Sequence, residues 1–255
     1  MLGLPEISIS TAGLIVSQSA PKAAIDQIHT HGVRGIALDA SVPDFRPREL
    51  TRSARRDLAA SLRRRELEFT GLDLWIPPEH FSNPINAHRA IEAVAQAAEM
   101  SAELATLVAG RSRPIVSVLL PTDLGEPERL AIGASAQRVG ALIADHQTEQ
   151  AEQIAGIGIG IDPVLILMNG HSPGKAVTHA STQLAAARLC DVNAMGRCVV
   201  GSQGAKLDLK GYAGALIVAS QASAQEWITL DLRQLPDPAQ AIERSTQAWT
   251  DAGTL

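Results

Sequence analysis

Short β-rich segments alternate with helical segments along most of this chain, and this alternation is the feature that most restricts its fold. The β-rich segments cover residues 6–14, 32–40, 67–76, 114–121, 157–167, 184–192 and 226–234. Helical patterns cover residues 18–31, 46–66, 83–108, 126–147, 207–219 and 236–252. Strands that alternate with helices pair in parallel through right-handed crossovers. Seven or eight such units in 255 residues favour a (β/α)8 TIM barrel, with an open doubly wound sheet as the alternative.

The alternation is interrupted once, after the helix expected over residues 126–147. A strand is expected at this point, but residues 148–156 read TEQAEQIAG, which is polar and helix-prone. We therefore expect one shortened or missing β/α unit near residues 148–156. The sequence shows no internal repeat, low-complexity tract or linker, so residues 1–255 are expected to form a single domain.

Composition and charge argue against several classes of protein. The net charge of −5 and the pI of about 5.8 give no overall basic field for nucleic acid, and the arginines within residues 52–65 are expected on a solvated helix face. No apolar run approaches the roughly 18 residues that span a bilayer, and the N-terminus lacks a cationic start followed by an apolar stretch. Cys190 and Cys198 form no zinc pattern and imply no disulfide framework. We expect a cytoplasmic protein without a membrane or nucleic-acid partner.

Two glycine-rich stretches look like nucleotide-binding loops but depart from their spacing. Residues 156–162 read GIGIGID, whereas the dinucleotide fingerprint needs G-x-G-x-x-G at a turn that opens a helix. The residues that follow its third glycine, 161–163, are not expected to open a helix. Residues 170–176 read GHSPGKA, with too few residues between the glycines for a phosphate loop and an alanine where a hydroxyl would bind magnesium. We interpret the first stretch as a barrel strand thinned by glycines, and residues 173–175 as the start of a helix.

Charged and polar side chains fall at or near the ends of the expected strands. In a TIM barrel the carboxyl ends of all strands open into one mouth, where the chemistry takes place. The residues concerned are Asp39, Asp73, His80, Asp162, Arg188, Asp191, Asp231 and Arg233. Acids that converge on one mouth could bind a divalent cation, because oxygen ligands suit magnesium and manganese. Such a metal could polarise a sugar carbonyl or hydroxyl while a carboxylate moves a proton.

These side chains also have structural interpretations. Asp162 precedes Pro163 and could simply cap a turn. Asp231 could form a structural ion pair with Arg233 or Arg188. Both alternatives, a functional and a structural role, stay open for the other strand-end residues.

Four stretches in the C-terminal half are similar to motifs of one known family. They are IDPVLILMNGHSPGKAV (161–177), ARLCDV (187–192), GAKLDLKGYAGAL (204–216) and WITLDLRQLPDPAQAIERS (227–245). They resemble an Asp-Pro after the sixth strand, a H-x-K-D-type strand, a G-x-[LV]-D segment before a helix and an [ED]-x-R near the last strand. These are features of the sugar phosphate isomerase/epimerase family, whose members are xylose isomerase-like TIM barrels. Residues 76–105 also resemble the third loop and helix of that family, so the likeness covers most of the chain.

The resemblance implies a divalent metal (Mn, Mg or Zn) held by a Glu, an Asp or His, a His and a Glu from the fifth to the eighth strands. Asp162 matches the sixth-strand acid, and Asp231 matches the eighth-strand acid, shortened from Glu. Arg188 lies near the place of the seventh-strand histidine, where it could pair with either acid or bind an anionic substrate. The fifth-strand Glu has no match, since Glu149 and Glu152 lie in a polar, helix-prone context. The metal site is therefore expected to be reduced.

The resemblance further implies an isomerase or epimerase that shifts a proton between adjacent carbons of a small sugar or sugar acid. Asp162 and Asp231 would be the catalytic residues and the ligands of any metal. The side chains expected to bind a small sugar-like or anionic substrate are Asp39, Asp73, His80, Arg188 and Arg233. The alternative is a catalytically inactive barrel that binds a ligand or a protein partner. Phosphodiester chemistry on DNA, as in the related endonuclease IV group, needs more His and Glu ligands than this chain offers.

Overall fold

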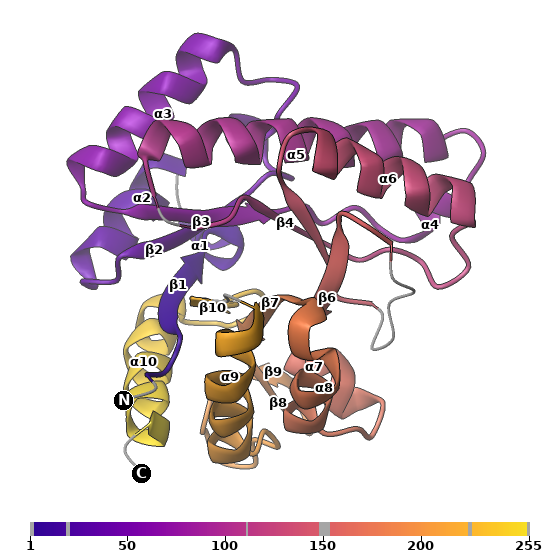
Figure 1. The fold of residues 1–255 in the computed structure, drawn as a ribbon. Coiled ribbons are helices and arrows are strands. Elements are labelled where there is room, and N and C mark those ends of the chain that lie inside the picture. The colour runs from indigo at the N-terminus through magenta and orange to yellow at the C-terminus, as the bar shows by residue number, and fades with distance from the viewer. Residues whose placement is uncertain (1–2, 19–20, 111, 148–153, 224–225, 254–255) are drawn as a thin grey trace.

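The computed structural model describes residues 3–18, 21–110, 112–147, 154–223 and 226–253, and eight parallel strands in these ranges close into a barrel. Figure 1 shows these strands at the centre of the molecule with helices around them. They are β1 (Glu6–Ser10), β2 (Gly35–Asp39), β3 (Glu68–Asp73), β4 (Ile115–Val118), β5 (Leu142–Asp145), β6 (Ile157–Ile161), β7 (Leu184–Leu189) and β10 (Trp227–Leu230). Each pairs with the next along the chain, and β10 closes the barrel on β1. The expected (β/α)8 barrel is confirmed.

The helices pack outside the barrel, and a short antiparallel hairpin lies beyond β7. The helices are α1 (Ala12–Gln18), α2 (Pro21–Thr30), α3 (Arg52–Arg64), α4 (Glu79–Ser82), α5 (Ala87–Val108), α6 (Glu126–Arg138), α7 (Pro163–Met168), α8 (Pro173–Ala180), α9 (Leu209–Ser223) and α10 (Pro238–Gly253). The hairpin strands are β8 (Asp191–Asn193) and β9 (Gly196–Cys198). In the described part of the chain, no helix is both long and apolar enough to cross a membrane.

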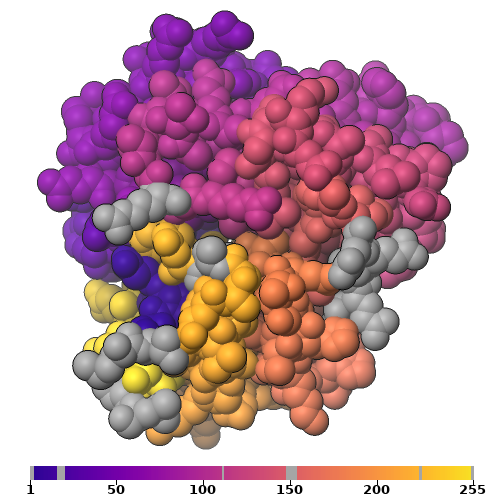
Figure 2. Space-filling view, in the orientation of Figure 1, coloured from indigo at the N-terminus to yellow at the C-terminus, as the bar shows by residue number. Residues whose placement is uncertain are grey.

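The beginning and the end of the chain pack together. Trp249 of α10 is buried, and its indole Nε1 donates a hydrogen bond of 3.0 Å to the carbonyl oxygen of Pro5. In the space-filling view of Figure 2, the indigo first residues accordingly lie beside the yellow last helix. This contact reinforces the closure of the barrel by the β1–β10 pair.

The fifth strand corrects the expectation of a missing or shortened unit. The helix expected over 126–147 ends at Arg138, and β5 follows at Leu142–Asp145. Gly140 adopts a positive φ of 72°, which turns the chain between the two elements at little steric cost. A strand of three apolar residues and Asp145 is too short to show a period of its own, so its sequence was not distinguished from the helical pattern before it. Of the interrupted stretch, residues 148–153 lie outside the described residues.

The stretch after the glycine-rich strand also differs from expectation. The strand expected over 157–167 ends at Ile161, and residues 163–168 form helix α7 instead. Asp162 is the N-cap of this helix: its Oδ1 accepts a 3.0 Å hydrogen bond from the amide of Val164, and Pro163 holds the first helical position. The expectation that Ile161–Pro163 do not open a helix was wrong, because Asp162 caps the helix and Pro163 suits its first position.

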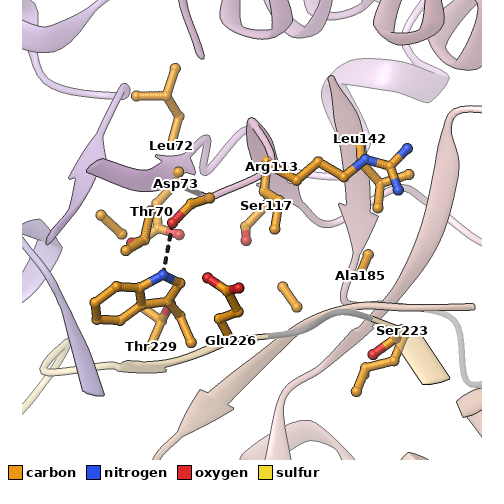
Figure 3. Close-up of a pocket in the computed structure, with 17 residues that line it drawn as sticks. Thr70, Leu72, Asp73, Arg113, Ser117, Leu142, Ala185, Ser223, Glu226 and Thr229 are labelled. Atoms are coloured by element: carbon orange, nitrogen blue, oxygen red, sulfur yellow. Dashed lines mark hydrogen bonds between the residues drawn. The ribbon is translucent and has the colours of Figure 1, made fainter. Parts of the chain in front are cut away.

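Small side chains line much of the barrel interior, where bulky branched residues are usual. A cavity of about 190 Å³ runs between the strands from Glu226 toward Asp73. Figure 3 shows the hydroxyl groups of Thr70 and Ser117 at its wall. The glycines of β6 belong to the same pattern: a Cβ at Gly158 would lie 2.8 Å from the Cβ of Ala185. The interior of this barrel therefore combines a cavity and polar hydroxyl groups with aliphatic side chains such as those of Leu72 and Ile115.

Gly160→Ala is expected to lower the free energy of unfolding by about 1–3 kcal/mol, the usual cost of overpacking. A Cβ at this position would lie 2.7–2.8 Å from three ring atoms of His146, which is buried and shares a 3.1 Å hydrogen bond with Ser117 Oγ. Gly214→Ala in α9 is the matched control, because a Cβ there meets nothing within 4 Å. Chemical denaturation measures both variants. Unchanged stability of Gly160→Ala would show that the imidazole is not held as described.

Candidate functional site

Six aspartates are buried at or near the carboxyl ends of the barrel strands, and four of them were expected to act at the mouth. The register of β2 on β3 places Asp39 beside Asp73. Asp162 directly follows β6, and Asp231 directly follows β10. Their exposed fractions lie between 1% and 6%. Buried carboxylates are unfavourable unless they are paired or protonated, so the surrounding cations decide what this mouth can do.

Arg188 of β7 is the first of these cations, and it is almost completely buried. Its Nη2 donates a 2.6 Å hydrogen bond to Asp73 Oδ1, while Ser10 Oγ donates to the other oxygen of that carboxylate. Its Nη1 lies 3.9 Å from Asp231 Oδ2. The guanidinium also lies 4.5 Å from the centre of the Trp75 ring, within cation–π range. Arg188 therefore joins the acids after β3 and β10 across the barrel interior.

Arg197 is the second cation, and it comes from the hairpin β8–β9. Its Nη2 donates to Asp162 Oδ2 at 2.8 Å, and its Nη1 donates to Asp231 Oδ2 at 2.9 Å. The hairpin is anchored by buried Asp191, whose Oδ1 accepts hydrogen bonds from three backbone amides, those of residues 192, 206 and 207. One guanidinium thus bridges the two acids that the sequence assigns to metal binding.

Arg233 is the third cation, and it completes the group. Its Nη2 and Nε donate to the two oxygens of Asp231, at 2.5 Å and 2.9 Å. Its guanidinium stacks on the ring of Trp75 at 3.4 Å from the centre and reaches within 3.7 Å of Asp162 Oδ2. We refer to Asp73, Asp162, Asp231, Arg188, Arg197 and Arg233 as the Asp–Arg network.

The Asp–Arg network balances three carboxylates against three guanidinium groups. Burial by itself raises the pKa of Asp231, but the nearby charges of Arg233, Arg197 and Arg188 outweigh it and hold that pKa well below the ordinary value. Burial lowers the pKa of Arg188, but the charges of Asp73 and Asp231 outweigh this effect and hold that pKa above the ordinary value. Asp231 and Arg188 therefore stay ionised at neutral pH, and the network is electrically neutral as a whole.

The spacing of one group of side chains suits a metal ion, but its surroundings do not. Ligand atoms of Asp162, Cys190 and Asp231 lie within 4.8 Å of one another, which meets the geometric condition for sharing an ion. However, both carboxylates already accept hydrogen bonds from Arg197. Cys190 Sγ donates to Asp162 Oδ1 at 3.4 Å, and burial raises the pKa of this thiol well above its ordinary value, so it is not a thiolate. As arranged, these donors do not fit a metal.

Solved structures resemble this chain in fold. No family model and no curated protein sequence matches it. The D-psicose 3-epimerase of Clostridium cellulolyticum H10 with D-tagatose aligns with a TM-score of 0.68 over 96% of this chain and 97% of its own, at 11% identity. The xylose isomerase domain protein of Planctomyces limnophilus gives 0.66 over 98% and 95%, also at 11% identity. This chain has the same TIM-barrel fold as these proteins.

A third structure with a similar fold contains a metal ion. It is a xylose isomerase-like TIM barrel protein of Mycobacterium smegmatis in complex with magnesium, with a TM-score of 0.65 over 98% of this chain and 97% of its own, at 9% identity. At such identities the likeness shows the fold alone. The chemistry of the barrel has to be argued from its own residues.

The structure brings most of the expected site residues together and leaves Asp39, His80 and Asp191 outside the Asp–Arg network. Asp39 accepts a 2.9 Å hydrogen bond from the amide of Ser41. Burial raises the pKa of Asp39, with a further contribution from Asp73. His80 lies exposed on α4, at the rim of the mouth. Glu149 and Glu152, considered for the fifth-strand ligand, lie outside the described residues.

Sequence reasoning missed buried Asp145, which ends β5, and also Arg197 and Trp75. Arg197 reaches the mouth because β8 and β9 form a hairpin, in which Asn193 pairs with Gly196. The run Asn193–Gly196 is a turn signal that could have revealed the hairpin. Trp75 follows β3 by two residues and was included only as part of an expected strand. The chain offers no local signal that two arginines would contact its ring.

His146 is expected to make the stability of the protein fall with decreasing pH below about 6.5, its ordinary pKa. All seven histidines are described, and His146 alone among them is buried. Burial, together with the charges of Arg188 and Arg233, lowers its pKa well below the ordinary value, against a smaller opposing effect of Asp231. Between the folded and unfolded pKa the unfolded chain binds the proton better, so stability changes by about 1.4 kcal/mol per pH unit.

The variant His146→Gln isolates this contribution, since glutamine keeps a hydrogen-bonding group near Ser117 Oγ. Denaturant unfolding between pH 5 and pH 7, the range in which histidine titrates, is expected to show a shallower pH slope for the variant than for the wild type. Parallel slopes would mean that His146 is not held neutral by the barrel.

Proposed function

We propose that this chain is a metal-independent barrel that binds a small sugar-like or anionic molecule at its mouth without converting it. The observation that carries this proposal is the position of Arg197, whose guanidinium donates to both Asp162 and Asp231. A positive side chain thus stands between the two carboxylates that a divalent ion would need. Arg188 and Arg233 add two more positive charges around Asp231.

Electrostatics supports this proposal over a metal-dependent activity. A divalent ion between Asp162 and Asp231 would have to displace Arg197, which is about nine-tenths buried. Both charge-assisted hydrogen bonds would be lost, and each is worth roughly 1.5–3 kcal/mol. The ion would then face the remaining guanidinium groups at short range, in a medium that screens them poorly. It would receive two carboxylates and a protonated thiol in return, which is a weak ligand set.

A second candidate function is the metal-dependent isomerase or epimerase expected from the sequence. The observation in its favour is the spacing of Asp162, Cys190 and Asp231, whose ligand atoms lie within 4.8 Å of one another. In this case Asp162 and Asp231 would hold the ion and move the proton between adjacent carbons of a small sugar or sugar acid. Arg197 would first have to leave the site together with its hairpin.

Deuterium incorporation into substrate distinguishes these two functions. A panel of ketoses, ketose phosphates and sugar acids is incubated in D2O with the protein, with and without added Mn²⁺, Mg²⁺ or Zn²⁺. NMR is expected to show no exchange at the carbons next to the carbonyl group, while ligand-induced thermal stabilisation appears without metal. Metal-dependent deuterium uptake would contradict the proposal and support the isomerase. A metal-dependent ketose epimerase serves as the positive control.

A further inference from the structure

A second cavity lies at the rim of the mouth, next to the Asp–Arg network. Its volume is about 350 Å³, within the range of roughly 300–1,000 Å³ typical of small-molecule sites. The loop after β2, the residues after β3 and the first turns of α5 line it. Trp75 belongs to its wall and also stacks on Arg233. We call this cavity the rim pocket.

The rim pocket is lined by positive side chains and by no carboxylate among the described residues. Arg46, Arg48 and Arg89 line it, together with His80. Arg46 and Arg48 both approach the same acid, Glu49, at 2.7 Å and 3.6 Å. Within the part of the chain that the structure describes, Arg89 forms no ion pair. Two of the three guanidinium groups therefore share one carboxylate, the third has none, and the pocket keeps an excess of positive charge.

The beginning of helix α5 adds to the positive character of the rim pocket. Helix α5 has 22 residues and begins beside the pocket, with no hydrogen bond from the side chain of its N-cap Asn86 and no acid in its first turn. The positive end of a helix dipole favours an anion at such a place. The charges and the helix end both favour an oxyanion.

We propose that the rim pocket binds the oxyanion group of a small metabolite, a phosphate or carboxylate, through Arg48 and Arg89. This inference deepens the proposed binding function and rests on it for the identity of the ligand. Arginine recognises such groups with paired, charge-assisted hydrogen bonds. Arg46 has a positioning part, since its Nη2 donates to the carbonyl oxygen of Ser41 at 2.7 Å and fixes the loop after β2.

Titration of the full chain, freed of metal with a chelator, tests the proposal. The probes are inorganic phosphate, a ketohexose monophosphate, the free ketohexose and gluconate. Binding of each probe is measured by calorimetry and by the change in tryptophan emission. Trp75 is the indole expected to report, because Trp227 and Trp249 are buried outside this pocket. Arg89→Ala and Arg48→Ala are each expected to weaken binding of the phosphates roughly tenfold or more. Arg56→Ala, an exposed arginine of α3 outside the pocket, is the matched control.

The arms of this experiment separate the possible ligands and the possible failures. Binding of the sugar phosphate and not of gluconate would assign a phosphate, and the reverse would assign a carboxylate. No saturable binding of any oxyanion, equal weakening by Arg56→Ala, or binding without a change in tryptophan emission would overturn the inference. In each of these cases, binding of the free ketohexose without metal would leave the proposed metal-independent function standing. Metal uptake by the wild type would contradict the proposed metal-independent function and leave the rim-pocket inference standing.

Discussion

Arg188→Met is expected to lower the free energy of unfolding by about 3–5 kcal/mol, the usual cost of removing one partner from a buried ion pair. The substitution keeps much of the side-chain length but leaves Asp73 buried without its cation. Arg188 and Asp73 are each about 1% exposed, so water cannot replace the lost partner. Denaturant unfolding at neutral pH measures this effect.

The exposed ion pair of Arg138 and Glu99 provides the control for this prediction. Its two side chains are 65% and 50% exposed, although the distance of 3.0 Å is similar to that of the buried pair. Arg138→Ala is expected to change stability by no more than about 1 kcal/mol. The double variant Arg188→Met with Asp73→Asn should recover part of the loss, because the unpaired charge is gone. A loss from Arg188→Met as small as that from Arg138→Ala would contradict the described network.

Arg197→Ala is expected to have two effects, a loss of stability and a gained response to divalent metal. The loss should be about 2–3 kcal/mol, between the values for exposed and fully buried pairs, since Arg197 is 11% exposed. Without this guanidinium, Asp162 and Asp231 repel each other, and a divalent cation relieves the repulsion. Added Mn²⁺ or Zn²⁺ should therefore raise the unfolding temperature of the variant but not that of the wild type.

Arg197→Lys is the matched variant for this experiment. Lysine keeps the charge but cannot bridge two carboxylates with a planar fork. It should lie between the wild type and Arg197→Ala in stability and show no response to metal. If Arg197→Ala is as stable as the wild type and its unfolding temperature does not change with metal, the guanidinium of Arg197 does not occupy the place of a divalent ion.

The alternation of strands and helices was sufficient to predict the barrel from the sequence, and also seven of its eight strands. β5 was missed because three apolar residues and Asp145, shortly after a helix, carry no period of their own. α7 was missed because its apolar residues read as a continuation of β6. In both cases the decisive signal was a single local residue, Gly140 with its positive φ or the capping Asp162.

The sequence could predict only those residues of the candidate site that lie at the ends of barrel strands. Asp73, Asp162, Asp231, Arg188 and Arg233 follow or end strands, and the barrel brings these residues together. The predicted pairing of Asp231 with Arg233 and Arg188 is present, and Asp162 is a helix cap as well as a member of the network. Their roles toward a substrate stay predictions.

Arg197 could not be placed from the sequence, because its position depends on long-range contacts. The hairpin that carries it is anchored when Asp191 accepts hydrogen bonds from the amides of residues 206 and 207. Its guanidinium then reaches acids that follow two different strands, 34 and 35 residues away along the chain. This one residue changes the interpretation of the site from a reduced metal centre to a neutral ion-pair network.

Metal analysis of the wild-type protein tests the central claim most directly. The protein is purified without chelator, loaded in turn with Mn²⁺, Mg²⁺ and Zn²⁺, desalted and measured for bound metal per chain, in parallel with its unfolding temperature. Because Arg197 occupies the space between Asp162 and Asp231, we predict no stoichiometric metal and an unchanged unfolding temperature. One equivalent of metal per chain that is lost in an Asp162→Asn variant would contradict the claim.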